Sequence, residues 1–250
     1  MPYLDRDGVR IYHDVTSRLG EAGESLPLLL SHGYGESSQM WRPNLAALSA
    51  GRRVITWDMR GHGRSDCPDD PAEYSQAACV ADMAALLDAH GATRAVLGGL
   101  SLGGYLSLAF WRAFPQAVAA LVLCATGPGF RSDRAREEWN DRAAATAERV
   151  SSQSPGLALA ALGMLAQQDG AVIDSLPSVG IPVLVLVGER DRPFLAAADY
   201  MAAKIPGALL VRLPEAGHTC NADQPDLFNR HVVAFLDPLG QSPDQQVPAR

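Results

Sequence analysis

Lysine is almost absent from this chain: of 21 basic residues among 250, only Lys204 is a lysine. The 28 acidic residues outnumber the basic ones, so the formal net charge is −7 at pH 7. A protein that binds nucleic acid needs a basic face to neutralise phosphates. The charge balance therefore argues against a nucleic-acid partner.

The sequence also lacks an unbroken apolar run of the length that a bilayer requires. Uncharged stretches cover 95–111 and 113–130, but glycine interrupts the first, and proline and glycine interrupt the second. A membrane-spanning helix needs about 20 consecutive apolar residues. The segment MPYLDRDGVR is too polar for a secretory signal. We therefore expect a soluble cytoplasmic protein with no membrane partner.

Cysteines are few and widely spaced. Cys67, Cys79, Cys124 and Cys220 form no C-x-x-C pair, so the sequence predicts reduced, buried thiols rather than a zinc site or a disulfide framework. The phosphate-loop, dinucleotide-binding and zincin motifs are missing as well. We therefore expect no metal and no organic cofactor.

Short runs rich in Val, Ile and Leu alternate along the chain with amphipathic stretches of helical length. Segment 8–16 alternates apolar and polar residues, which predicts an antiparallel edge strand. Six further runs do not alternate and predict strands covered on both faces, at 26–33, 52–58, 94–100, 119–126, 181–188 and 208–214. Helices are predicted between them, at about 38–50, 75–90, 102–114, 194–204 and 224–236. This order predicts an α/β fold, with a mostly parallel sheet and helices on both faces.

One long segment interrupts that alternation. Between Thr126 and Ile181 the pattern predicts helices at about 133–149 and 156–168 and no strand. We interpret 131–178 as a small helical lid, inserted into a core formed by 1–130 and 179–237, and 238–250 as a disordered tail. Several apolar lid residues either line a substrate pocket or form the lid's own core: Trp139, Leu157, Leu159, Leu162, Met164 and Leu165.

The lid region also carries five arginines that could clamp an anionic substrate. They are Arg131, Arg134, Arg136, Arg142 and Arg149. Five acidic residues match them one for one: Asp133, Glu137, Glu138, Asp141 and Glu148. We therefore expect a solvated helix face rather than a clamp.

A candidate nucleophile lies in the run Gly99-Leu100-Ser101-Leu102-Gly103, directly after a predicted strand and at the start of a predicted helix. A sharp turn between a strand and a helix strains the serine backbone, and small residues two before and two after avoid collisions. The helix amino terminus favours developing negative charge near Ser101. Without catalysis, the same run would be a glycine-rich turn that packs a helix on a sheet.

A serine hydroxyl needs a base that a third group orients. His218 follows the last predicted strand, and the carboxyl ends of strands are where ligands meet α/β sheets. Asp191 follows strand 181–188 and is the candidate acid, with Glu189 as its local competitor and a salt bridge to Arg190 or Arg192 as the structural alternative. Among the other histidines, those at 13, 90 and 231 are assigned to an edge strand, a helix end and a helix surface, and His32 to a structural loop position.

An acyl-transfer site also needs donors for the oxyanion. The backbone N–H of Leu102, the residue after the nucleophile, should be one of them. The other should come from the loop after strand 26–33, which reads His32-Gly33-Tyr34-Gly35. Glycine leaves the backbone there open to a substrate oxygen. We choose the N–H of Tyr34, with Gly35 as second choice.

Five segments together resemble successive landmarks of the α/β-hydrolase superfamily: HGYGES, DMRGHGRSD, GLSLGG, VGERD and GHTCNADQP. They span about residues 5–236. The sequence is most similar to small esterases and enol-lactonases, including 3-oxoadipate enol-lactonases, and to cofactor-free perhydrolases. The resemblance implies Ser101 as nucleophile, Asp191 as acid, His218 as base, and Tyr34 and Leu102 as oxyanion-hole residues. It implies a structural role for the loop that contains His62.

The expected activity is hydrolysis of a small or medium carboxylic ester through an acyl-enzyme on Ser101. Lactone hydrolysis uses the same groups and is the nearest alternative. Perhydrolysis and C–C bond cleavage with the same triad stay open. A ligand receptor on the same fold is the alternative from another class, since fold alone does not determine function. Substrate identity and oligomeric state are not predicted.

Overall fold

The computed structural model describes residues 2–17 and 25–240 of the chain. These residues form an eight-stranded sheet in the order β1-β2-β4-β3-β5-β6-β7-β8. β1 (Tyr3–Arg6) lies at one edge and pairs antiparallel with β2 (Val9–Thr16), which also pairs antiparallel on its other side. The segment expected as an edge strand, 8–16, is therefore antiparallel as predicted but is not at the edge. All the others run parallel: β3 (Leu28–Ser31), β4 (Val54–Trp57), β5 (Ala95–Leu100), β6 (Val118–Cys124), β7 (Val183–Gly188) and β8 (Leu209–Leu213). The predicted α/β fold with a mostly parallel sheet is confirmed.

β1 is the strand that sequence reasoning missed. It is short and polar, and it pairs with β2 through a tight turn in which Asp7 and Gly8 both have positive φ, at 57° and 92°. Such a two-residue hairpin turn suits the twist of antiparallel strands. A strand of four residues carries too little alternation to reveal itself without its partner.

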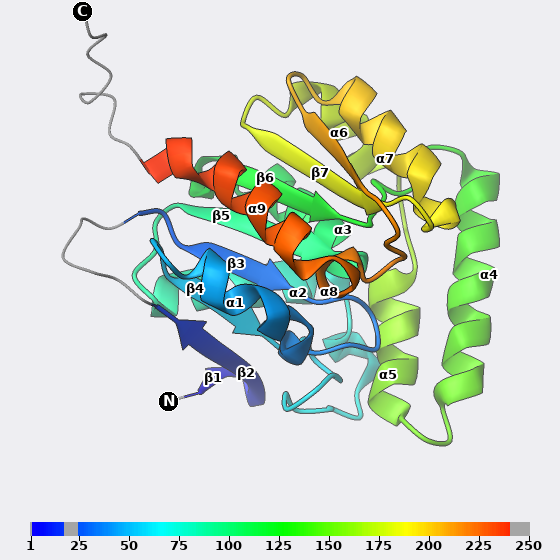
Figure 1. Cartoon of the computed structure of the whole chain (residues 1–250). Helices are drawn as coiled ribbons and strands as arrows, with labels where there is room; N and C mark the ends of the chain where they lie inside the picture. The colour runs from blue at the N-terminus through cyan, green and yellow to red at the C-terminus, as the bar shows by residue number, and fades with distance from the viewer. Residues whose placement is uncertain (1, 18–24, 241–250) are drawn as a thin grey trace, which may run out of the picture.

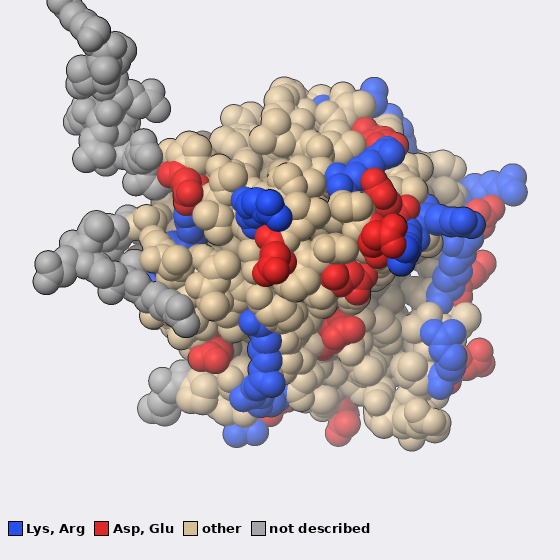
Figure 2. All heavy atoms as spheres, viewed as in Figure 1, with Lys and Arg blue, Asp and Glu red and all other residues tan. Residues whose placement is uncertain are grey.

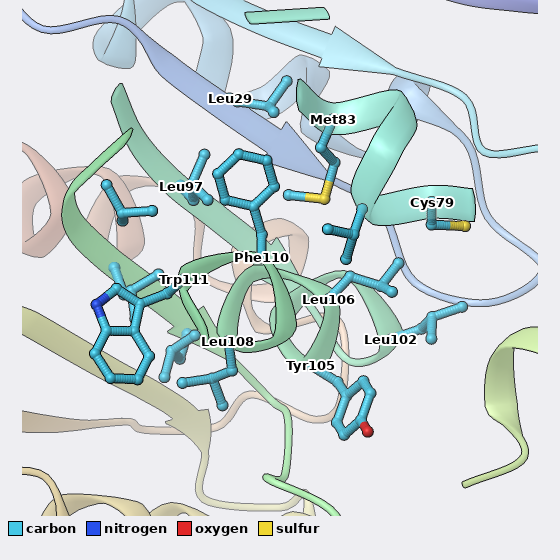
Figure 3. Close-up of a cluster of buried hydrophobic side chains, with 14 of the residues drawn as sticks. Leu29, Cys79, Met83, Leu97, Leu102, Tyr105, Leu106, Leu108, Phe110 and Trp111 are labelled. Atoms are coloured by element: carbon cyan, nitrogen blue, oxygen red, sulfur yellow. The ribbon is translucent and has the colours of Figure 1, made fainter. Parts of the chain in front are cut away.

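Helices cover both faces of the sheet (Figure 1). α1 (Arg42–Leu48) and α9 (Pro225–Leu236) pack on one face. α2 (Gln76–Ala89), α3 (Leu102–Ala113) and α7 (Arg192–Lys204) pack on the other. Figure 3 shows Phe110 of α3 between Leu97 of β5 and Met83 of α2, with Leu106 further along the same helix. Because this packing buries α3 against the sheet, its first turn is held rigidly at the carboxyl end of β5.

α2 departs from the predicted amphipathic pattern at Asp82. The spacing of apolar residues puts Asp82 on the polar side with Asp88, yet its side chain is fully buried. Its carboxylate accepts hydrogen bonds from Arg60, at 2.7 and 2.9 Å, and from Arg6 at 3.2 Å. A buried carboxylate is tolerated when it is paired and hydrogen-bonded in this way. The pair anchors the loop after β4 on α2.

Between β6 and β7 lies a helical insertion made of α4 (Asp133–Val150), α5 (Pro155–Ala160) and α6 (Ala171–Ser175). α4 and α5 stand beside the carboxyl ends of the strands (Figure 1). The helix expected over 156–168 ends earlier, because a π-helical turn over Ala161–Leu165 follows α5. The predicted domain boundaries stay predictions: a lid over 131–178, inserted into a core formed by 1–130 and 179–237.

At the carboxyl end, the expected disordered tail from 238 is wrong for its first residues. Asp237–Gly240 continue α9 as a 3₁₀ turn. Residues 241–250 of that prediction lie outside the described residues. The short helix α8 (Cys220–Asp223), just before α9, is a further element without a sequence signal of its own.

Two expectations from composition can be compared with the structure. Cys79, Cys124 and Cys220 are buried as expected, but Cys67 is exposed, because it lies in the loop after β4 and not in a strand or helix. Within 2–17 and 25–240, no helix combines the length and the apolar character that crossing a bilayer requires.

Candidate active site

Ser101 occupies a strained turn between β5 and α3. Its backbone has φ 55° and ψ −116°, a conformation that residues other than glycine rarely adopt. Its N–H donates to the Cys124 carbonyl at 2.9 Å, and its carbonyl accepts from the Thr126 hydroxyl at 2.6 Å. The neighbouring strand end therefore holds the strained residue from both sides.

The two flanking glycines leave no room for a side chain. A Cβ on Gly99 would lie 2.2 Å from the carbonyl carbon of Gly103. A Cβ on Gly103 would lie 2.2 Å from the Ser31 carbonyl oxygen. Both contacts are with backbone, which cannot move aside. This agrees with the steric argument for small residues on either side of the serine.

Asp191 and His218 meet across the ends of β7 and β8. His218 Nδ1 lies 2.8 Å from Asp191 Oδ2, and the Asp191 side chain is 4% exposed. A carboxylate only accepts hydrogen bonds, so Nδ1 carries the proton and Nε2 keeps its lone pair. In this tautomer Nε2 is the nitrogen that can accept a proton.

Backbone hydrogen bonds hold the two loops together. The Glu189 N–H donates to the Leu213 carbonyl at 3.0 Å, and the Arg190 N–H donates to the Ala216 carbonyl at 2.9 Å. The side chain of Glu189 is exposed, while Arg190 forms its salt bridge with Glu215 and not with Asp191. The geometry thus favours Asp191 over Glu189 as the group that orients His218.

Ser101 and Leu102 line a cavity of about 410 Å³, which Phe194 also lines. The Phe194 ring stacks on His218, with ring centroids 4.8 Å apart and an interplanar angle of 30°. Phe194 therefore connects the lining of this cavity to the His218 ring. Among the described residues, no hydrogen bond joins the Ser101 hydroxyl to His218; catalytic hydrogen bonds often form only once substrate is bound.

The two backbone groups chosen for the oxyanion hole are free to donate. In the described part of the chain, neither the Tyr34 N–H nor the Leu102 N–H donates a hydrogen bond. A Cβ on Gly33 would lie 3.6 Å from the Ser101 Cβ, so the loop after β3 runs directly beside the serine. The Tyr34 hydroxyl donates to the Leu157 carbonyl at 2.9 Å and ties this loop to α5.

His32 and His62 are both buried in loops, and their structural roles stay predictions. His32 is fully buried: its Nε2 accepts from the Met59 N–H at 2.9 Å and its Nδ1 donates to the Gly33 carbonyl at 2.7 Å. Burial lowers the pKa of His32 to about 4 and that of His62 to about 3, where the nearby His32 adds to the effect. Both rings are therefore neutral near pH 7. His13 and His90 bond to each other, at 3.2 Å, and His231 lies on α9.

The candidate lid residues divide between two cavities. Trp139, Met164 and Leu165 line the cavity at Ser101. Leu157 and Leu159 line a second cavity of about 390 Å³, next to His62, and Leu162 is 51% exposed. Within the described residues, no group of three His, Cys, Asp or Glu side chains is arranged to hold a metal ion.

Two residues of the site escaped sequence reasoning. Thr126 fixes the Ser101 carbonyl, and Phe194 supports the His218 ring; both line the cavity at Ser101. Thr126 stands at the end of a predicted strand and Phe194 three positions after Asp191. That placement, at the carboxyl edge of a parallel sheet, is the signal that could have singled them out.

Comparison with known proteins gives a consistent result. Residues 27–153 match the family described as "alpha/beta hydrolase fold". A 3-oxoadipate enol-lactonase 2 of Acinetobacter baylyi is 30% identical, over 84% of this chain and 88% of its own. A putative 2-succinyl-6-hydroxy-2,4-cyclohexadiene-1-carboxylate synthase of Bacillus subtilis is 28% identical, over 92% and 96%. The structure of a thermophilic esterase from Thermogutta terrifontis superimposes with a TM-score of 0.83 at 28% identity, over 96% and 98%.

Proposed function

The chain belongs to the alpha/beta hydrolase family, and from that premise we propose that it is a serine hydrolase that cleaves small-to-medium carboxylic esters through an acyl-enzyme on Ser101. The observation that carries the proposal is the 2.8 Å contact between His218 Nδ1 and the buried Asp191, at the same sheet edge as the strained Ser101. Ser101, Asp191 and His218 follow β5, β7 and β8. These strands run parallel, so their carboxyl ends lie on the same side of the sheet.

Acylation uses the lone pair of His218. Its Nε2 takes the proton of the Ser101 hydroxyl while Oγ attacks the ester carbonyl. Asp191 stabilises the imidazolium that forms and keeps the ring in the required tautomer. The N–H groups of Tyr34 and Leu102 donate to the oxyanion. His218 then returns the proton to the departing alkoxide, so an alcohol leaves and the acyl group stays on Ser101.

Deacylation repeats these steps with water. His218 removes a proton from a water molecule, whose oxygen attacks the acyl carbonyl. The second tetrahedral intermediate is stabilised by the same two N–H groups. When it collapses, Ser101 recovers its proton and the carboxylic acid is released. We propose that the helical insertion forms the outer wall of this site and acts as its lid, since Trp139, Met164 and Leu165 line the cavity at Ser101.

Lactone hydrolysis is the second candidate, and the names of two relatives favour it. The Acinetobacter baylyi protein is an enol-lactonase, as is a protein of known structure from Burkholderia xenovorans. In a lactone the alkoxide stays attached to the acyl chain, and the same groups act. A ligand receptor is the contrasting possibility on this fold, and turnover separates it from an enzyme.

The test is labelling with a fluorophosphonate, read by intact mass and peptide mapping, beside turnover of p-nitrophenyl acetate and butyrate. We expect one adduct, on Ser101, and loss of both adduct and turnover in Ser101→Ala. Ser178→Ala removes an exposed hydroxyl of the insertion and serves as the matched control, with labelling and turnover retained. A protein that takes no adduct, or takes it elsewhere, lacks an activated Ser101 and would favour the receptor.

A further inference from the structure

The cavity at Ser101 has apolar walls and contains a single ionic side chain. Among the described residues that line it, Arg142 carries the one formal charge, and none is acidic. We propose that the site takes esters or lactones bearing a second, free carboxylate, and that Arg142 binds this carboxylate. The inference rests on the serine hydrolase activity proposed above and specifies its substrate class.

Three of the other arginines near Arg142 in the sequence are paired with carboxylates. Arg131 pairs with Asp174 at 2.6 Å, Arg134 pairs with Glu138 at 2.9 Å, and Arg136 pairs with Asp133. Figure 2 shows the resulting mixture of blue and red along the outer side of α4. Within the described residues, Arg142 has no carboxylate within 4.0 Å. The expected solvated face describes the paired arginines. Among the described residues Arg149 has no carboxylate within 4.0 Å either, but it does not line the cavity, whereas Arg142, although exposed, does.

The walls of the cavity strengthen an ionic contact. Phe130 and Trp139 pack with ring centroids 5.7 Å apart, and Trp139 is held by a 2.7 Å hydrogen bond from its Nε1 to the Leu165 carbonyl. Apolar walls lower the local dielectric constant, so a charge pair is worth more there than in open water. A guanidinium also matches the planar geometry of a carboxylate through two parallel hydrogen bonds.

Gln167 supplies a second, independent donor. Its side chain is 8% exposed and lines the same cavity. Oε1 accepts from the Phe130 N–H at 3.1 Å, which directs Nε2 away from that bond. Among the described residues, Nε2 donates no hydrogen bond. A buried amide with an unused N–H₂ group in a cavity is suited to a ligand oxygen.

The position of Gln167 is built into the site. Asn140 Oδ1 accepts from the Gln167 N–H at 2.8 Å, and Asn140 Nδ2 donates to the Gln167 carbonyl at 2.9 Å. Gly129, at φ 87°, leaves the space that the amide fills: a Cβ there would lie 2.6 Å from Gln167 Oε1. Among its described lining residues, the cavity thus has one cationic side chain and one fixed neutral hydrogen-bond donor. None of them carries a negative charge that would repel an anion.

The experiment compares two ethyl esters of equal length. Monoethyl adipate carries a carboxylate, and ethyl 5-carbamoylpentanoate carries a neutral amide in its place. Hydrolysis is followed near neutral pH by the acid released. We expect kcat/KM to be about tenfold higher for the carboxylate ester, at the lower end of what hydrogen bonds to charged groups give, because Arg142 is partly solvated.

The variants test the ratio of the two kcat/KM values. Arg142→Gln should bring the ratio close to unity, and Arg142→Lys should retain part of the preference. Gln167→Glu keeps the acceptor for the Phe130 N–H and replaces the donor, so it should lower the ratio as well. Arg134→Gln, on the same helix but paired with Glu138, is the matched control and should keep the wild-type ratio. Thermal melting of each variant verifies that it is folded.

Three results would overturn the inference. Equal kcat/KM for both esters in the wild type would show that Arg142 is a solvated surface residue. An unchanged ratio in Arg142→Gln would assign the preference to another group. Stronger competitive inhibition by inorganic phosphate than by adipate would mean that Arg142 binds a phosphate group and not a carboxylate. Failure of the proposed activity looks different: neither ester is hydrolysed and no fluorophosphonate adduct forms on Ser101.

Discussion

The two sides of the cavity at Ser101 are held by different kinds of interaction. On the sheet side, the strained Ser101 and the loops of Asp191 and His218 are fixed by backbone hydrogen bonds and by glycines that meet backbone. On the side of the insertion, α4 is tied down by side chains, such as the Asn140 amide and the Trp139 indole. Four of its charged residues pair with one another near the surface.

This difference assigns separate tasks to the two sides. Backbone contacts tolerate almost no displacement, and such rigidity is what acid–base and oxyanion chemistry requires. Side-chain contacts can be exchanged one residue at a time without disturbing the sheet. We infer that the sheet side carries the chemistry and the insertion side selects the substrate. Substitutions on the two sides should therefore change different quantities.

The largest effect is expected from Asp191→Asn. An asparagine of similar shape can hold His218 in the wrong tautomer, so turnover of p-nitrophenyl butyrate should fall by about 10⁴-fold. Glu189→Gln, two residues earlier and exposed, is the matched control and should retain turnover. If Asp191→Asn retained wild-type turnover, the acid of this site would have to be another residue.

A second effect concerns stability on the sheet side and its pH dependence. Burial lowers the pKa of His32 to about 4, below the ordinary histidine value that applies in the unfolded chain. As the pH falls from about 6.5 towards 4, the unfolded chain binds a proton that the folded protein does not. The free energy of unfolding should therefore decrease by up to about 1.4 kcal/mol per pH unit for this residue.

Urea unfolding at several pH values measures this slope. His32→Gln lacks the titrating ring, so its slope should be smaller than that of the wild type over the same range, although the variant is less stable throughout. His231→Gln, on α9, is the control and should keep the wild-type slope. Equal slopes for the wild type and His32→Gln would mean that His32 does not determine the acid sensitivity.

The smallest effect is expected on the insertion side, from Asn140→Ala. This change removes the two hydrogen bonds to Gln167, which should lower the free energy of unfolding by about 1–2 kcal/mol. It should also reduce the preference for the carboxylate ester, because Gln167 is no longer held in the cavity. Asp141→Asn, the exposed neighbour, should change neither quantity. A large drop in turnover of both esters would contradict the division of tasks.

Much of the sheet side could be predicted from the sequence. Apolar runs without alternation mark buried parallel strands, and their carboxyl ends meet at one edge, so the residue pattern alone leads us to expect Ser101, Asp191 and His218 there. The observed contact between His218 and Asp191 agrees with that expectation, while the catalytic roles stay a proposal. β1 and Phe194 were missed, since a four-residue strand and one aromatic side chain carry no periodic signal.

The insertion could not be predicted to the same depth. Arg142 and Arg134 are equivalent in the sequence, as arginines of one helix among as many acidic residues. Which arginine finds a carboxylate depends on the rotation of α4 and on the segment that packs against it. The buried Asp82 is a similar case in the core. Its position on α2 predicts an exposed side chain, but it is buried because Arg60 and Arg6, from other segments, pair with it.

The sequence by itself determined the order along the chain of the six parallel strands and of the helices that cover the sheet, the strand-to-helix turn at Ser101 and the strand ends that carry Asp191 and His218. These follow from local periodicity and from the small residues that a sharp turn requires. Only the tertiary structure decided which charges pair, that Gln167 has an unused donor, and that Arg142 lines the cavity. Pairing and exposure are properties of segments far apart in the chain, and they are set when those segments pack.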